Sequence, residues 1–279
     1  MRKLLNFVTF YAMKDFITVR TLLMENESHL KLELICSRNG LNRKITSAEL
    51  HRPGLAISGF VELFTSDRVQ IMGNTEMKYL SGLSREELER KINRYVEFEI
   101  PAIIVTENNE IPEFFEKAAK RHYISILRTP FSTTQTTHLL GEYLEEKFAP
   151  QVSKHGTLVD VYGVGILLTG RSGIGKSEIA LDLVERGHRL VTDDLVIIKR
   201  KSEDILIGKG TEISQHALEI RGVGLIDVGR IFGIRGVRMQ KRVEVEVKLV
   251  DWKRGEEYER IGIEDATTNI LGIKVPQIV

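Results

Sequence analysis

The feature that most constrains the fold is an apolar run that leads into a glycine-rich loop and then into a helical pattern. Val164–Leu168 has no polar side chain, which predicts a buried strand. The loop that follows reads Gly170-Arg-Ser-Gly-Ile-Gly-Lys-Ser177, and Glu178–Val184 has helical spacing. This is the G-x-x-x-x-G-K-S pattern, in the strand–loop–helix context that a phosphate-binding loop requires. An accidental match is expected in about 1 chain in 100 of this length.

The chemistry of this loop follows from its residue types. Glycines at three positions let the backbone coil so that successive N–H groups face phosphate oxygens, and the helix adds the positive end of its dipole. The Lys176 ammonium can reach the β- and γ-phosphates, and the Ser177 hydroxyl can bind Mg²⁺. The pattern therefore predicts a site for a nucleoside triphosphate with Mg²⁺. Its predicted nucleotide-binding residues are Gly170, Arg171, Ser172, Gly173, Ile174, Gly175, Lys176 and Ser177.

Composition limits the partners. The 279 residues are 42% hydrophobic and 28% charged, typical of a soluble globular protein with room for two domains. The 40 Lys and Arg residues balance 39 Asp and Glu, so we expect neither nucleic acid nor a membrane as partner. The single cysteine, Cys36, lies in an apolar run and is expected to be a buried core thiol in a reducing cytoplasm. The first twelve residues are interpreted as an extension before a start at Met13.

Residues 1–148 are expected to form a small α/β domain, because short strand patterns alternate with helical ones. Ser84 and Glu87 form a capping-box pattern at the start of a predicted helix, Arg85–Tyr95. Pro101–Val105 is predicted to be a strand. Gln151–Lys154 is polar and follows a proline, which predicts an inter-domain linker. Residues 149–279 are then the catalytic domain.

The second half places further polar groups near the loop. A strand at Leu158–Tyr162 precedes the loop strand directly, which favours a mixed or antiparallel sheet. Asp193-Asp194 follows an apolar strand, so one carboxylate can hold the metal and the other can accept a proton. Glu219 and Arg221 share a tight turn and suit a second metal ligand and a phosphate clamp.

The region after this turn gives weaker signals. The alternating residues Lys241–Val250 predict one half-buried strand. Trp252 is expected in the core, and Arg254–Arg260 is expected to be a charged turn.

Taken together, several segments resemble the bacterial HPr kinase/phosphorylase family over nearly the whole chain. The Glu-Ile-Arg-Gly sequence is more diagnostic than the phosphate loop, which many families share. The segments of the second half are His155-Gly156, Leu158–Gly163, Gly170–Ser177, Gly187–Val191, Asp193-Asp194 and Glu219–Gly222. Those of the first half are Glu49–Gly54, Gly59-Phe60 and Pro101–Ile104.

The resemblance implies an α/β fold: a small N-terminal α/β domain, regulatory or for assembly, and a C-terminal P-loop kinase domain like phosphoenolpyruvate carboxykinase, with a mixed sheet. It implies a cytoplasmic homohexamer. It also implies phosphorylation of a serine of the phosphocarrier protein HPr by ATP, or by pyrophosphate, with Mg²⁺. The reverse reaction would be phosphorolysis by inorganic phosphate, giving pyrophosphate, and the enzyme would regulate carbon catabolite repression.

The resemblance also implies roles for individual residues. Lys176 stabilises the transferring phosphates, while Ser177 and Glu219 hold Mg²⁺. Asp194 accepts the proton in phosphorylation and returns it in dephosphorylation. The other catalytic residues implied are His155 and Arg260. The segment implied to serve both activities comprises Leu218, Glu219, Ile220, Arg221, Gly222, Val223, Gly224, Leu225, Ile226 and Asp227.

Two departures from the family pattern leave alternatives open. The family continues beyond Val279 with a Pro- and Arg-containing loop and further helices, which predicts that this chain is shortened. Arg235 stands where the family usually has a small residue, and it either alters phosphate handling or is simply solvated. The alternatives to the kinase are a nucleotide-binding regulatory module without catalysis and a carboxykinase-like small-molecule kinase.

Overall fold

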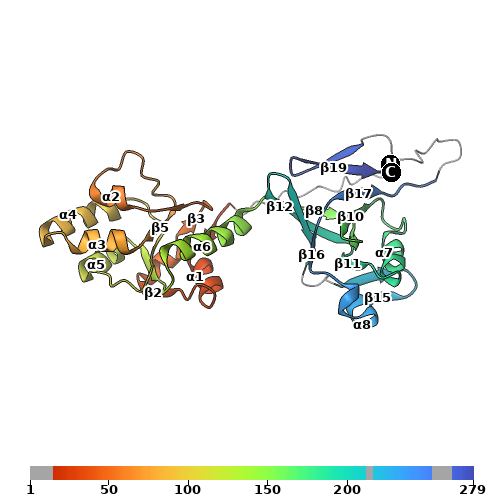
Figure 1. The fold of residues 1–279 in the computed structure, drawn as a ribbon, viewed down its shortest axis with the longest axis horizontal. Helices are drawn as coiled ribbons and strands as arrows, with labels where there is room; N and C mark the ends of the chain where they lie inside the picture. Colours follow the sequence, from red (N-terminus) through yellow and green to blue (C-terminus); the bar gives the residue numbers. More distant parts are fainter. Residues whose placement is uncertain (1–14, 212–215, 253–265) are drawn as a thin grey trace, which may run out of the picture. The chain divides into compact units, whose positions relative to one another are not determined.

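The computed structural model describes residues 15–211, 216–252 and 266–279. The chain divides into two compact units, Lys14–Phe148 and Ala149–Val279 (Figure 1). The expected extension before Met13 and the expected charged turn at Arg254–Arg260 lie outside the described residues. Within the described ranges, no helix combines the length and the apolar character needed to cross a membrane.

The first unit is built on a five-stranded sheet in the order β2-β7-β6-β5-β4. Strands β4 to β7 pair in parallel, and β2 pairs with β7 in the antiparallel sense at one edge. The strands are β2 (Glu33–Cys36), β4 (Leu50–His51), β5 (Val69–Met72), β6 (Ala102–Val105) and β7 (Ser125–Arg128), with a separate ribbon of β1 (Ile17–Thr18) and β3 (Lys44–Ile45). The helices are α1 (Val19–Asn26), η1 (Arg38–Asn42), α2 (Gly54–Ser58), α3 (Asn74–Ser81), α4 (Arg85–Val96), α5 (Glu113–Arg121) and α6 (Thr133–Phe148).

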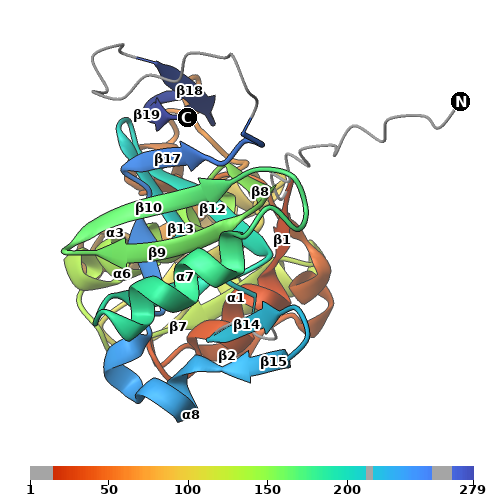
Figure 2. The same cartoon turned by 90° about the vertical axis from the view of Figure 1, so that its right-hand side faces the viewer.

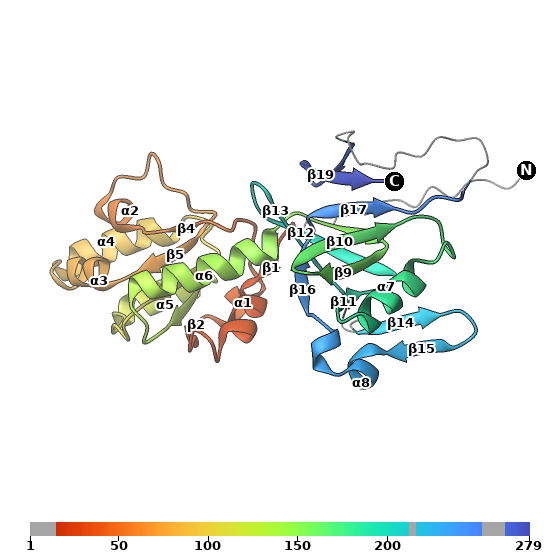
Figure 3. The same cartoon turned by 45° about the vertical axis from the view of Figure 1, so that its right-hand side comes forward.

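Both faces of this sheet are covered, since neighbouring strand residues point to opposite sides. In β6, Ile103 and Val105 pack with α2 to α5, whereas Ala102 and Ile104 pack with α1 and α6 (Figures 1 and 3). All four side chains are fully buried. This explains the uninterrupted apolar run of β6, which is typical of a parallel strand between two helical layers.

The predicted helix with the capping box is confirmed as α4. The Ser84 hydroxyl accepts a hydrogen bond from the Glu87 amide, and the Glu87 side chain reaches back to Ser84. Cys36, expected to be fully buried, is only partly buried, because β2 is an edge strand.

The second unit holds a six-stranded mixed sheet in the order β11-β9-β10-β17-β19-β18 and a four-stranded antiparallel sheet, β16-β13-β12-β8. The predicted mixed sheet is confirmed, since β10 pairs with β9 antiparallel and with β17 parallel. The strands are β8 (Gln151–His155), β9 (Thr157–Val161), β10 (Val164–Thr169), β11 (Arg189–Thr192), β12 (Leu195–Ser202), β13 (Ile205–Lys209), β14 (Ala217–Ile220), β15 (Gly224–Asp227), β16 (Gln240–Arg242), β17 (Val245–Lys248), β18 (Thr267–Ile270) and β19 (Ile273–Ile278). The helices are α7 (Lys176–Glu185), α8 (Val228–Phe232) and η2 (Ile234–Gly236).

The mixed sheet is buried on both sides. In β9, Leu158 packs into a core shared with the second sheet, while Val159 packs against residues of α7. Figure 2 shows α7 lying along the β9–β10 pair, with the β14–β15 hairpin beside it. This arrangement fixes where the loop between β10 and α7 emerges.

Three expectations for this unit were wrong. The predicted linker Gln151–Lys154 is part of β8, where Val152 is buried opposite Ile198. It looked like a linker because it has a single inward-facing apolar residue. The predicted strand Lys241–Val250 is broken into β16 and β17, and Trp252 is 73% exposed instead of in the core.

Two glycines give opposite predictions for alanine substitution. At Gly165 in β10, a Cβ would collide with the backbone carbonyl of Arg242, so Gly165→Ala should lower the free energy of unfolding by about 1–3 kcal/mol. At Gly141 in α6 a Cβ meets no atom within 4 Å, so Gly141→Ala should raise it by roughly 0.5–1 kcal/mol. Urea unfolding measures both, and a neutral Gly165→Ala would contradict the packing described.

Candidate active site

The phosphate-loop pattern forms the predicted strand, loop and helix. β10 ends at Thr169, and α7 begins at Lys176. Gly175 caps α7 with a φ of 108°, a backbone conformation that glycine adopts without strain. Lys176 is 94% buried, and its ammonium donates to the carbonyls of Gly170 and Arg171 at 3.3 and 3.2 Å. The Lys176 ammonium is therefore held next to the first two residues of the loop.

A pocket of about 170 Å³ opens at this helix end. It brings together predicted site residues from the phosphate loop and from segments before and after it in the sequence. Its lining residues are His155, Ser172, Gly173, Gly175, Lys176, Ser177, Glu178, Asp193, Asp194, Glu219 and Arg221. Three loop residues do not line it, namely Gly170, Arg171 and Ile174. The predicted catalytic residue Arg260 lies outside the described residues.

Asp193 is the buried centre of this pocket. The residue is 5% exposed, and one carboxylate oxygen accepts from the fully buried Thr157 hydroxyl at 2.5 Å. The other oxygen accepts from the Ser177 hydroxyl at 2.7 Å and from the Glu219 amide at 3.4 Å. A β-bulge between Leu190 and Thr192 precedes Asp193, and such bulges re-aim side chains near active sites.

Asp194, the next residue, lines the same pocket but is exposed. Its side chain is 76% exposed, and its carboxylate lies 3.0 Å from Nδ1 of His155. The same ring nitrogen lies 2.9 Å from the Asp194 carbonyl oxygen. Asp194 has a φ of 66°, an uncommon backbone conformation for a residue other than glycine. The pair therefore presents an accessible carboxylate that a histidine orients.

Glu219 and Arg221 come from the β14–β15 hairpin, seen beside α7 in Figure 3. Leu218 and Ile220 point into the core, so the intervening Glu219 is exposed toward the pocket. The Arg221 guanidinium packs directly over Gly173, leaving no room for a Cβ there. Among the predicted segment Leu218–Asp227, only Glu219 and Arg221 line this pocket.

Three further contacts hold the start of the loop. Thr169 donates to the buried carboxylate of Glu246 at 2.7 Å, and Lys154 pairs with the same carboxylate at 3.1 Å. On the outside, the Arg171 guanidinium binds both oxygens of Asp251 at 2.7 and 2.6 Å. This ion pair raises the pKa of Arg171.

The donor atoms fit a magnesium ion. Mg²⁺ prefers oxygen ligands and is usually bound by one or two carboxylates together with substrate phosphates. Here the Ser177 hydroxyl and the Asp193 carboxylate are adjacent, and Glu219 lines the same pocket. Within the described ranges, no three His, Cys, Asp or Glu side chains form a preassembled metal cage. Ser177, Asp193 and Glu219 are the residues that could hold such an ion.

Sequence reasoning did not identify every residue of this network. The residue pattern alone left open which aspartate holds the metal and which accepts the proton, and only the family resemblance implied the proton-accepting role of Asp194. The structure separates a buried Asp193 from an exposed Asp194. Sequence reasoning missed Thr157 entirely, since a threonine in a strand carries no motif. Glu246 was missed as well, although a lone carboxylate among the apolar residues of a predicted strand could have drawn attention to it.

Two family models match the chain. The model described as HPr Serine kinase N terminus matches residues 17–144, and the HPr Serine kinase C-terminal domain matches residues 146–279. An HPr kinase/phosphorylase of Chloroherpeton thalassium is 48% identical over 250 residues, which cover 89% of this chain and 73% of that relative.

A second relative is more distant but matches over a longer stretch. The HPr kinase/phosphorylase of Leptospira biflexa is 43% identical over 264 residues, covering 94% of this chain and 82% of that relative. The solved structure of the Hpr(Ser) kinase/phosphatase from Coxiella burnetii is 34% identical. It covers 45% of this chain and 76% of that chain, with a TM-score of 0.42.

The Thr157–Asp193 contact gives a prediction about stability. Thr157→Val keeps the side-chain shape but leaves a buried carboxylate oxygen without its donor, so unfolding should become easier by about 1–3 kcal/mol. Thr157→Ser, which keeps the hydroxyl, is the matched control. Urea unfolding of both variants measures the difference, and equal stabilities would argue against the hydrogen bond.

Proposed function

The chain belongs to the HPr kinase/phosphorylase family, and from that premise we propose that it phosphorylates a seryl hydroxyl of the protein HPr. Members of this family are enzymes, protein-serine kinases, and this chain is one of them. One observation carries the proposal. The phosphate-loop residues Lys176 and Ser177 share a pocket with the exposed carboxylate of Asp194. A donor phosphate and an acceptor hydroxyl can therefore meet there.

The loop side of the pocket binds the phosphoryl donor, which we propose is ATP or pyrophosphate. The amides at the start of α7 and the Lys176 ammonium bind its phosphate oxygens, the ammonium leaving the loop carbonyls. Ser177, Asp193 and Glu219 would hold Mg²⁺, which offsets the negative charge of the phosphates. Arg221, packed over Gly173, is placed to contact the transferring group.

The other side of the pocket handles the proton. Asp194 is exposed enough for a protein hydroxyl to approach, and it accepts the seryl proton as the serine oxygen attacks phosphorus. His155 orients this carboxylate through Nδ1. In the reverse direction inorganic phosphate attacks phosphoserine, the seryl oxygen leaves with the proton from Asp194, and pyrophosphate forms. One carboxylate serves both directions by microscopic reversibility.

The wider setting follows from the family resemblance. We propose a cytoplasmic homohexamer that regulates carbon catabolite repression, with residues 1–148 in a regulatory or assembly role. The half-buried single thiol of Cys36 suits a reducing compartment.

The proposed reaction predicts one phosphoryl group added to a serine of HPr. Incubating the chain with HPr from the same organism, Mg²⁺ and ATP should give this mass increase, and later excess phosphate should remove it with release of pyrophosphate. Lys176→Ala should abolish the gain, whereas Lys201→Ala, an exposed lysine at the end of β12, should not. ATP binding without any modification of HPr would instead favour a regulatory module without catalysis.

The role of Asp194 predicts a loss of rate without loss of nucleotide binding. Asp194→Asn keeps a side chain that tolerates a positive φ but cannot accept the proton, so phosphoryl transfer should slow by about 10²- to 10⁴-fold. Single-turnover kinetics with a parallel ATP-binding titration separate the two effects. A variant as fast as the parent would remove Asp194 from the proposed mechanism.

A further inference from the structure

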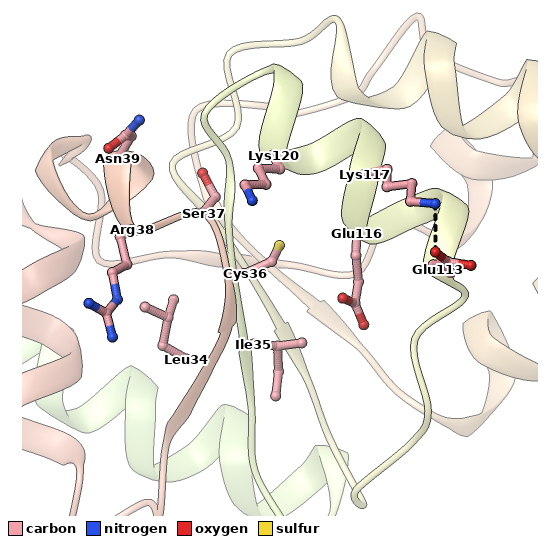
Figure 4. A pocket seen from close by; sticks show the side chains of 10 residues that line it. All are labelled: Leu34, Ile35, Cys36, Ser37, Arg38, Asn39, Glu113, Glu116, Lys117 and Lys120. Atoms are coloured by element: carbon pink, nitrogen blue, oxygen red, sulfur yellow. Dashed lines mark ion pairs between the residues drawn. The ribbon is translucent and has the colours of Figure 1, made fainter.

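A second cavity lies in the first unit, which contains none of the residues of the proposed active site. It has a volume of about 680 Å³ and is formed by β2, the start of η1, and α5 (Figure 4). Small-molecule sites usually measure about 300–1,000 Å³, so the size suits a metabolite. Leu34 and Ile35 give it an apolar side.

Only two of the charged side chains around this cavity form an ion pair with each other. Lys117 and Glu113 form an ion pair at 2.5 Å, one helical turn apart on α5. The side chains of Arg38, Lys120 and Glu116 make no hydrogen bond or ion pair with any described residue. Figure 4 shows the Lys120 and Glu116 side chains on the α5 side of Cys36, and the Arg38 side chain beside Leu34, across the β2 ribbon. Two unpaired cations and one unpaired carboxylate leave the cavity with a net positive charge.

Ser37 supplies an independent observation. It lines the cavity and is only 7% exposed, yet its hydroxyl has no hydrogen-bond partner among the described residues. It also has a φ of 62°, in the left-handed region that serine rarely adopts. The Ser37 carbonyl is held there by the Ser125 hydroxyl at 2.9 Å and the Gly40 amide at 3.0 Å. A buried hydroxyl without a partner and a strained backbone both cost stability, and such features cluster at ligand sites.

We propose that this cavity binds a small organic anion through Arg38, Lys120 and the Ser37 hydroxyl. A guanidinium and an ammonium together recognise a carboxylate or a phosphate group. Glu116 accepts hydrogen bonds from hydroxyl groups elsewhere on the ligand, and the carbon skeleton packs on Leu34 and Ile35. The first unit is thereby a metabolite-binding domain, whether or not the second unit phosphorylates HPr.

The test uses the only cysteine of the chain as a reporter. Cys36 lines this cavity, and burial raises the pKa of its thiol. The rate at which a reagent modifies the thiol therefore depends on how easily the reagent enters the cavity. The rate of labelling by N-ethylmaleimide, a neutral reagent, is measured on the full chain with inorganic phosphate, glycerol 3-phosphate or lactate. One of the two organic anions should slow labelling by about tenfold at saturation, because a bound ligand excludes the reagent from most molecules. Which of them protects distinguishes a phosphate from a carboxylate site.

Variants of the cavity residues test whether the ligand protects Cys36 by binding in this cavity. The ratio of rates with and without ligand is compared within each variant, since removing a charge also changes the thiol itself. Arg38→Ala and Lys120→Ala should lose the protection, whereas Arg90→Ala, an exposed cation on α4, should keep it. Lys176→Ala should also keep it, which excludes an effect of the phosphate loop. Protection by none of the three anions, equal protection by inorganic phosphate, or protection that survives Arg38→Ala and Lys120→Ala would overturn the proposal.

Discussion

The buried carboxylate of Asp193 is the interaction on which the site depends. It joins three elements that are distant in sequence: β9 through Thr157, α7 through Ser177, and β14 through the Glu219 amide. A buried carboxylate needs hydrogen-bond donors to compensate for lost hydration, and two of the donors here, from Ser177 and Glu219, belong to residues that line the pocket. The hydrogen bonds that compensate for the burial of the Asp193 carboxylate therefore also hold Ser177 and Glu219 at the pocket.

The mixed sheet makes this arrangement possible. Because β9 runs antiparallel to β10, Thr157 at the start of β9 lies beside the end of β10, where the loop begins. β12 pairs with β8 in the same sense, which places His155 opposite Leu195, next to Asp194. An all-parallel sheet would send the residues before the loop strand to its opposite edge. The antiparallel neighbours thus bring His155 and Asp194 to the loop between β10 and α7.

Local patterns predicted local structure well, and long-range contacts poorly. The loop at Gly170–Ser177 and the capping box at Ser84 depend on spacings of a few residues, so both could be predicted from the sequence. The strand β8 could not, because its polar residues resemble a linker until β12 pairs with it. The contact between Thr157 and Asp193 spans 36 residues and depends on strand register, which no motif records. The roles of the site residues remain proposals for the same reason.

The backbone conformation of Asp194 also limits which side chains fit at this position. At a φ of 66° a side chain with a branched or bulky Cβ is strained, while aspartate, asparagine and glycine are tolerated. The backbone at this position therefore favours a short side chain of the aspartate or asparagine type, independently of its charge. Glutamate keeps the charge but does not share the tolerance of aspartate and asparagine for a positive φ. A substitution that keeps the charge can therefore still strain the backbone at this position.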